Sequence, residues 1–358
     1  MNELYSINDK KLSYIEGKGF PVKREIQTIF AVPEINTVGT NALNNAITLL
    51  KFNDEKGTMK YDTVRRNFKK YVYGGDMFFL PEFSKDTIAY SQTRGFLLFN
   101  INDKTFMDFS IGRVLGIVIE EVFPIDGEKN LFLFDLSYLL GMDKEIKVLK
   151  LLDLTKEEPK EIAYFDIEKH PLWAALGKTT FYFTEEDEIR SLHALNQLLK
   201  PIDHPLCAVY NTKTEGVGRF GLPHIHPSLP FAILSENNPQ NAEHLVTWVA
   251  TWRDKEPKMY KIFGDNLLGR FQFSPDGKWL LFQDDTIKKD MLMVMPVDPD
   301  LPHFLSPPIM LQSNDTMNGD LNGKCAWISD PLSVVTTRPD KLIKWQISPN
   351  TIHYKITK

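Results

Sequence analysis

The sequence has 358 residues, of which 42% are hydrophobic and 25% charged, and its formal net charge is -5. These proportions are typical of a folded globular protein and exclude an intrinsically disordered chain. The small net charge argues against a nucleic-acid binder, which needs clustered Lys and Arg to contact phosphates. We therefore expect no nucleic-acid partner.

Two further classes of protein are excluded by simple counts. Cys207 and Cys325 are the only cysteines, and neither has metal-binding spacing around it, which excludes a disulfide-rich scaffold and a cysteine-based zinc module. The two are either buried thiols or one long-range disulfide. No run reaches the ~18 apolar residues of a membrane span, and the start lacks an export signal. As it stands the sequence predicts a soluble, cytoplasmic chain; removal of an N-terminal signal would make it periplasmic or extracellular.

Strand signals dominate the chain from beginning to end. Short runs of aromatic and branched residues alternate with Asp, Gly, Asn and Pro, and sustained helical periodicity is scarce. The predicted strands, with the turns that join them, fall into groups, which we list in chain order: 5–15, 26–32 and 47–52; 82–90 and 96–101; a turn at 123–127, then 131–134 and 146–152; 172–176, 179–183 and 189–195; 230–234, 244–252 and 259–263; the hairpin 271–282, then 291–297 and 308–311; 325–328, 332–336, 342–347 and 351–356.

The clearest element is a hairpin between Phe271 and Phe282. Its centre, Ser274-Pro275-Asp276-Gly277, has turn chemistry, because Pro presets φ and Gly accepts a positive φ. Apolar strands flank this turn on both sides. Weaker versions of the same order of turn and strands recur along the chain.

This recurrence predicts the fold. The groups repeat every ~40 to 55 residues, close to the spacing of propeller blades. We expect an all-β chain that forms a single β-propeller of about seven blades, each of four antiparallel strands; closures with six or eight blades are also compatible. The segment from Glu55 to Asp76 is expected to be an excursion between blades. The expected blades span residues 3–55, 76–118, 119–165, 170–205, 224–265, 269–315 and 320–358.

The hairpin carries a family resemblance. The run from Phe273 to Leu280 resembles the repeat signature of TolB-type, WD40-like propellers, although the Trp-Asp ending of WD40 blades is absent. The resemblance implies a propeller that serves as an interaction platform, and it carries no catalytic residue to this chain.

One pair of histidines could bind a metal. His224 and His226 are separated by one residue, so an extended segment would place both imidazoles on one face. Such a pair suits a divalent metal such as Zn or Mn. A central metal site would fit a lyase or hydrolase that acts on an acidic carbohydrate at the central channel. Alternatively, the segment is a stiff strand entry whose histidines bond to the backbone.

A basic and aromatic segment could bind a partner. It combines four cationic and two aromatic side chains, a mixture that can grip and stack on a ligand. We expect an acidic partner protein, or else a solvated loop that covers a blade edge. The residues are Arg65, Arg66, Lys69, Lys70, Tyr71 and Tyr73.

Familiar hydrolytic motifs are absent. The sequence contains no GxSxG and no HExxH, which removes the usual serine hydrolase and zincin signatures. The main functional hypothesis is a non-catalytic β-propeller without a cofactor that binds another macromolecule, a protein in the first place and a carbohydrate in the second. The alternative is the metal-dependent carbohydrate enzyme with His224 and His226 as ligands.

Overall fold

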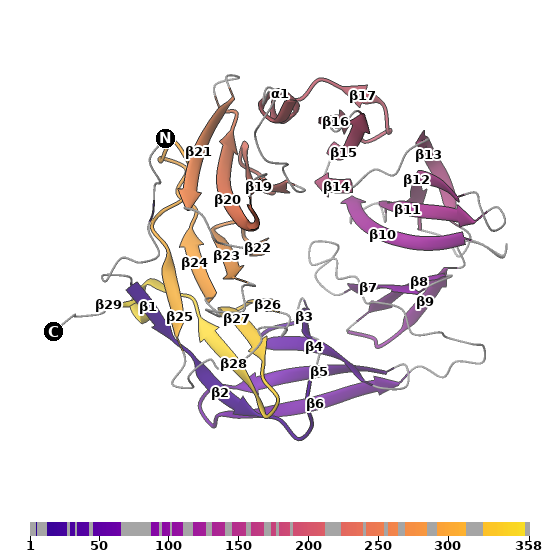
Figure 1. Cartoon of the computed structure of the whole chain (residues 1–358). Coiled ribbons are helices and arrows are strands. Elements are labelled where there is room, and N and C mark those ends of the chain that lie inside the picture. Colours follow the sequence, from indigo (N-terminus) through magenta and orange to yellow (C-terminus); the bar gives the residue numbers. More distant parts are fainter. Residues whose placement is uncertain are drawn as a thin grey trace. The chain divides into compact units, whose positions relative to one another are not determined.

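The structure is a computed structural model, and part of the chain is described in it. The described residues are 5, 13–26, 29–32, 34–42, 46–65, 87–92, 95–100, 102–109, 117–126, 131–139, 145–154, 159–167, 173–176, 179–186, 189–211, 223–238, 241–253, 257–263, 269–284, 292–312 and 325–354. Within these ranges the fold is all-β, with one short helix, α1 (Pro205–Asn211), and one 3-10 turn, η1 (Pro349–Thr351). Figure 1 shows the strands as arrows. No helix of the described part is long and apolar enough to cross a membrane.

The chain divides into two compact units. Unit 1 comprises residues 1–27, 185–193 and 203–358, and unit 2 comprises residues 28–184 and 194–202. Unit 1 therefore combines the beginning of the chain with its last part.

Unit 1 contains three sheets. Helix α1 contacts β20 of the first of them. Sheet G has the order β18-β19-β20-β21, bounded by His224–Ile225, Phe231–Asn238, Asn241–Thr251 and Lys258–Phe263. Sheet A has the order β22-β23-β24-β25-β1-β29, bounded by Gly269–Phe273, Trp279–Asp284, Leu292–Pro296, Ile309–Gln312, Ser13–Glu16 and His353–Tyr354. Sheet B has the order β2-β28-β27-β26, bounded by Lys18–Pro21, Lys341–Gln346, Leu332–Thr337 and Ala326–Ser329.

Unit 2 contains three further sheets and most of a fourth. Sheet C has the order β3-β4-β5-β6, bounded by Ile29–Ala31, Thr37–Ala42, Ala46–Asn53 and Thr58–Arg65. Sheet D has the order β7-β8-β9, bounded by Thr87–Gln92, Gly95–Asn100 and Phe106–Phe109. Sheet E has the order β10-β11-β12-β13, bounded by Ile117–Asp126, Leu131–Leu139, Glu145–Asp153 and Lys160–Ile167. Sheet F has the order β14-β15-β16-β17, bounded by Trp173–Leu176, Thr179–Glu186, Ile189–Leu195 and Pro201–Ile202.

The beginning of the chain completes two sheets made by its end. Strand β1 pairs in parallel with β25 of sheet A, and β2 pairs in antiparallel fashion with β28 of sheet B. In Figure 1 the indigo strands β1 and β2 lie beside the strands of the last part of the chain. We call residues 13–21 the N-terminal arm. Ile15 and Phe20 of this arm are fully buried, so the arm is part of the core of unit 1.

The predicted hairpin at Phe271 is confirmed in detail. Strands β22 and β23 pair across the turn, with Phe273 opposite Leu280. Gly277 has a φ of +66°, which is the conformation that favours glycine. The Asp276 carboxylate accepts hydrogen bonds from the Ser274 hydroxyl at 2.6 Å and from the Lys278 backbone N–H at 3.0 Å. The turn is therefore fixed by its own side chains.

Aromatic residues of sheets G and A form one core of unit 1. Phe231 of β19 stacks on Phe304, with ring centroids 4.8 Å apart, and meets Phe273 edge to face at 5.6 Å. Burying such side chains stabilises a fold by about 1.5–3 kcal/mol each. The methionines of β24 serve the same core, because Met293 and Met295 are both fully buried in it. These strands therefore read as continuously apolar because both faces of the sheet are covered.

The structure changes the expected grouping at the N-terminus. We expected residues 3–55 to form one blade, but their strands belong to three sheets: β1 to sheet A, β2 to sheet B, and β3, β4 and β5 to sheet C. Pairing with β25 and β28 buries Ile15 and Phe20, which a separate N-terminal blade would have to cover in another way. The expected excursion from Glu55 is also corrected, because residues 58–65 form strand β6.

Candidate interaction surface

His226 connects sheet G to the turn of the hairpin in sheet A. Its ring is 2% exposed and lies 4.8 Å from both Phe231 and Phe273, centroid to centroid. Nδ1 accepts the backbone N–H groups of Ser228 at 3.1 Å and Leu229 at 2.8 Å, so Nε2 carries the proton and donates to the Gly277 carbonyl at 2.7 Å. Burial lowers the pKa of His226 against the opposing effect of the Gly277 carbonyl.

His224 lies on the same side as His226 but in a different environment. Its ring packs on Phe271 at 5.4 Å, as the ring of His226 packs on Phe273, so the pair faces two alternate phenylalanines of β22. His224 itself is exposed. Among the described residues, no group of three or more His, Cys, Asp or Glu side chains is placed to hold a metal. The metal site at His224 and His226 stays a prediction.

The basic segment is described only at its first residue. Arg65 is the last residue of β6 and pairs with Ala46 of β5. It therefore belongs to a strand end and not to the expected loop. Arg66, Lys69, Lys70, Tyr71 and Tyr73 lie outside the described residues. Their role as a partner-binding segment stays a prediction.

The two cysteines are separate thiols. Neither Cys207 nor Cys325 takes part in a disulfide. Burial raises the pKa of Cys207 to about 11, so this sulfur is protonated near neutral pH and is a poor nucleophile. Of the two alternatives for the cysteines, the long-range disulfide is therefore wrong.

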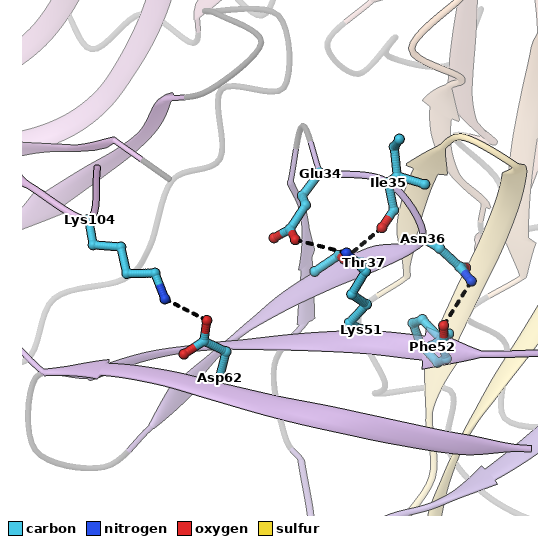
Figure 2. Close-up of polar contacts among 8 residues, drawn as sticks. All are labelled: Glu34, Ile35, Asn36, Thr37, Lys51, Phe52, Asp62 and Lys104. Atoms are coloured by element: carbon cyan, nitrogen blue, oxygen red, sulfur yellow. Dashed lines mark hydrogen bonds and ion pairs between the residues drawn. The ribbon is translucent and has the colours of Figure 1, made fainter. Parts of the chain in front are cut away.

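A rigid turn at one end of sheet C presents an exposed isoleucine. Ile35 is 62% exposed, and the next residue, Asn36, has a φ of +53°. The Asn36 side-chain amide donates to the Phe52 carbonyl at 3.0 Å and to an Asp54 carboxylate oxygen at 2.8 Å. The Thr37 hydroxyl donates to the Ile35 carbonyl at 2.8 Å. Figure 2 shows the contacts of Asn36 with Phe52 and of Thr37 with Ile35, together with the exposed ion pair of Lys51 and Glu34.

An ion pair connects sheets C and D at the protein surface. Lys104, which precedes β9, lies 2.6 Å from an Asp62 carboxylate oxygen of β6, and both side chains are 47% exposed. Figure 2 shows the contact between Lys104 and Asp62. An exposed pair of this kind contributes at most about 1 kcal/mol.

The edges of sheets D, E and F expose large apolar side chains. Strands β9, β13 and β17 are the last strands of these sheets in the hydrogen-bonding order. Together with Ile35, the five residues on or beside them are all of the large apolar residues that are exposed in the described part of the chain, and all six belong to unit 2. We call the five residues the edge-strand surface: Met107 (46% exposed), Ile162 (40%), Tyr164 (47%), Leu198 (53%) and Ile202 (38%).

Ionic and aromatic contacts hold part of the edge-strand surface in place. The Lys150 ammonium lies 5.7 Å from the centroid of the Tyr164 ring and 2.8 Å from a Glu161 carboxylate oxygen. Leu199, the neighbour of the exposed Leu198 in the sequence, packs with Leu151 and other leucines in a cluster shared by sheets E and F. Ordered side chains lose less entropy when they are covered by a partner. Tyr164 is thus held by Lys150, and Leu198 lies next to a packed leucine in the sequence.

The fold is propeller-like, and comparison with solved structures supports this assignment. The structure of hydrazine synthase from Kuenenia stuttgartiensis has a TM-score of 0.52 at 9% identity and covers 94% of this chain and 97% of its own. The structure of U3-55K has a TM-score of 0.51 at 9% identity and covers 91% and 96%. Both are β-propeller proteins. No protein-family model and no curated protein matches the sequence, so the likeness concerns the fold alone.

The edge-strand surface was not predicted from the sequence. Strand β13 was missing from the predicted strands, although Ile162, Tyr164 and Ile167 have the branched and aromatic character of a strand. The alternation of Ile162 and Tyr164 was a usable signal for a half-exposed strand. What the sequence lacks is any sign that β13 ends its sheet, because the identity of the edge strand depends on pairing.

Proposed function

We propose that the protein is a non-catalytic interaction platform that binds another protein through the edge-strand surface of unit 2. The observation that carries this proposal is the restriction of exposed large apolar residues to one unit. Single exposed apolar residues are ordinary. A set confined to sheet edges in one unit, with none among the described residues of the other, is a distribution that a binding function explains.

The chemistry of the edge-strand surface suits a protein partner. Tyr and Met are enriched at the centres of protein interfaces, and a tyrosine on a rigid strand loses little entropy on binding. Tyr164 has this position on β13, held by Lys150. An edge strand also offers backbone groups that an extended segment of a partner can pair with. The bulge of β13 opposite Leu151 and Leu152 limits such pairing, so we expect side chains to supply most of the affinity.

A comparison of partner sets tests the proposal. Tagged wild-type chain is compared with a variant that carries Ile162→Ser and Tyr164→Ser, and with one that carries Leu198→Ser and Ile202→Ser, by quantitative mass spectrometry of captured proteins. We expect at least one partner of the wild type to fall about tenfold or more in a variant, which corresponds to about 1.4 kcal/mol. The matched control carries Lys258→Ser and Gln346→Ser, which alter exposed residues of unit 1. Equal capture by all forms would contradict the proposal.

The basic segment is a second contact that we propose for the same partner. Substituting Arg65, Arg66, Lys69 and Lys70 with Ala removes four positive charges. If an acidic partner uses them, binding falls and its dependence on salt weakens, because fewer ion contacts remain to be screened. Binding with an unchanged salt dependence would remove the segment from the proposal.

Metal analysis separates the platform from the enzyme alternative. A platform is expected to lack stoichiometric metal and to keep its melting temperature after treatment with a chelator. Bound Zn or Mn that is lost on His224→Ala or His226→Ala would favour the enzyme that acts on acidic carbohydrates.

A further inference from the structure

The first residues of the chain pair with strands of all three sheets of unit 1, and in sheet A strand β1 lies between β25 and the last strand, β29. The Tyr5 backbone N–H donates to the Ile262 carbonyl of β21 at 3.0 Å, and the Tyr5 hydroxyl donates to the Leu305 carbonyl at 2.6 Å. Burial raises the pKa of Tyr5, with Asp298 adding to the effect, so the hydroxyl remains a donor over a wide range of pH. Farther along, β1 and β2 of the N-terminal arm cover β25 and β28.

The N-terminal arm has a different covalent neighbour from the unit that it completes. Residue 27 ends the first segment of unit 1 and residue 28 begins unit 2. The main part of unit 1 starts only at residue 203. The arm is therefore continuous in sequence with unit 2 and is attached to unit 1 by non-covalent contacts. An element with this connectivity can be exchanged between identical chains without a change in its contacts.

The site that receives the arm is specific for its side chains. Ile15 enters a core with Trp345 and Ile343, and Phe20 is 0% exposed. Between the two strands, a Cβ atom at Gly17 would lie 2.5 Å from Trp345 Nε1 and 2.7 Å from Ile343 Cγ2. Real side chains do not approach so closely, so the sequence must place a glycine at this point. The arm thus fits the receiving surface at three positions: Ile15 and Phe20 are buried in it, and Gly17 leaves room for Trp345 and Ile343.

We propose that the outer edges of β25 and β28 form a strand-addition site that takes the N-terminal arm of a second copy of this chain. A second copy is the occupant because its arm carries the same complementary side chains. Within one chain, the short connection to unit 2 gives the arm a high effective concentration. The closed monomer therefore prevails in dilute solution, and exchanged dimers form when the arm is loosened or the chain is concentrated.

A labelled peptide of residues 11–22 tests the site with the full-length chain. The chain with Gly17→Ala has a weakened arm and an intact receiving surface, so it is expected to capture about tenfold more wild-type peptide than the wild-type chain does, the change expected from weakening the arm by about 1.4 kcal/mol. The same substitution in the peptide is expected to abolish capture. Gly17→Ala should therefore raise peptide capture when it is in the chain and lower it when it is in the peptide. A general loosening of the fold would not produce these opposite changes.

Gly19→Ala is the matched control. A Cβ atom at Gly19 would meet Lys341 Cδ at 3.4 Å, an ordinary contact with a flexible side chain, so this substitution should leave capture unchanged in either molecule. If the Gly17→Ala chain does not fold, Ile15→Ala in the chain takes its place. A chain that captures no peptide with either variant would overturn the proposal.

The exchanged dimer is tested with two tagged full-length chains. They are concentrated together, warmed below the melting temperature, cooled, and examined for co-capture. Mixed dimers that increase with concentration are expected. They should form faster when both chains carry Phe20→Ala, because this substitution loosens the arm and weakens its contacts equally in the closed and exchanged forms. Absence of mixed dimers at the highest soluble concentration would contradict the second copy as occupant. The result is independent of the edge-strand surface, because all of the substituted residues belong to unit 1.

Discussion

His226 holds together two segments that are 51 residues apart. One ring nitrogen accepts two backbone N–H groups of its own loop, and the other donates to the carbonyl of Gly277. These bonds fix one tautomer of the neutral ring. A proton on Nδ1 would face two donors at close range, so the folded state favours the neutral imidazole, in agreement with the lowered pKa.

We predict that His226 makes the fold sensitive to acid. Its pKa in the folded state lies below the usual value of 6.5, so the unfolded chain binds more protons in the interval between the two. The stabilisation from neutral His226 is complete above pH ~6.5 and decreases as the pH falls toward the folded pKa. Urea unfolding at pH ~7.5 and ~5.5 measures this slope. His226→Ala should flatten the slope, and not abolish it, since burial also lowers the pKa values of His193, His204, His224 and His303.

The same substitution should lower stability at neutral pH. His226→Ala orphans three backbone groups, and each costs about 1–3 kcal/mol if water does not replace the partner. His224→Ala is the matched control, because His224 is exposed two residues away, and it should cost less. Equal losses for the two variants would contradict the assigned role of His226.

Gly39 is required by the ring opposite to it. Gly39 pairs directly with Phe30 across β3 and β4, and a Cβ atom at Gly39 would overlap the Phe30 ring. We predict that Gly39→Ala destabilises the protein by about 1–3 kcal/mol or more, the range found for overpacked cores. In a double-mutant cycle with Phe30→Leu, the combined loss should be smaller than the sum of the two losses. Strict additivity would mean that the two positions do not interact.

At the scale of elements, the turn before β4 depends on one asparagine. Asn36 tolerates the left-handed backbone better than most residues, and its amide makes two hydrogen bonds to residues at the end of β5. Asn36→Ala is predicted to cost about 1–2 kcal/mol through strain and lost hydrogen bonds. Asn36→Gly also removes the amide hydrogen bonds, but glycine adopts the positive φ without strain. It should therefore destabilise the protein less than Asn36→Ala does. Chemical denaturation checks both variants, and a larger loss for Gly than for Ala would contradict the role of the backbone conformation.

Local chemistry explains which elements could be predicted. The residues Ser274 to Gly277 themselves favour a turn, so this turn could be predicted. The strand predicted at 291–297 is β24, and each of its ends differs from the prediction by one residue. The N-terminal arm carries no such local sign. Its partners β25 and β28 come near the end of the chain. The one feature of the arm's sequence that reflects this pairing is Gly17, which the close approach of Trp345 requires. The pairing of β1 and β2 with the end of the chain is therefore a tertiary property that propensity does not encode.

The candidate sites show the same division. The spacing of His224 and His226 correctly indicated a shared side, because alternate residues of an extended segment point the same way. The alternative that the histidines bond to the backbone holds for His226, whose two ring nitrogens both have backbone partners. The spacing did not indicate which backbone groups these would be, since two of the three lie in the following loop and the third is that of Gly277. The exposure of Ile162 and Tyr164 depends on β13 being the last strand of sheet E, which only the sheet order shows.

At the scale of the whole molecule, the division into two units has a measurable consequence. Phe20 and Phe132 are both 0% exposed, the first in the N-terminal arm and the second in sheet E. Truncating a buried phenylalanine costs about 3–5 kcal/mol. We predict that Phe20→Ala accelerates amide hydrogen exchange mainly in peptides of residues 203–358, although position 20 is far from them in sequence.

Phe132→Ala provides the reciprocal test. It should accelerate exchange mainly within residues 28–184 and leave unit 1 closer to the wild type, because locally destabilised units open with their own free energies. The pair of variants is measured under identical conditions by mass spectrometry. If Phe20→Ala instead accelerates exchange evenly over both units, the chain unfolds as one cooperative body, and the docking of the arm cannot be loosened separately from the rest of the fold.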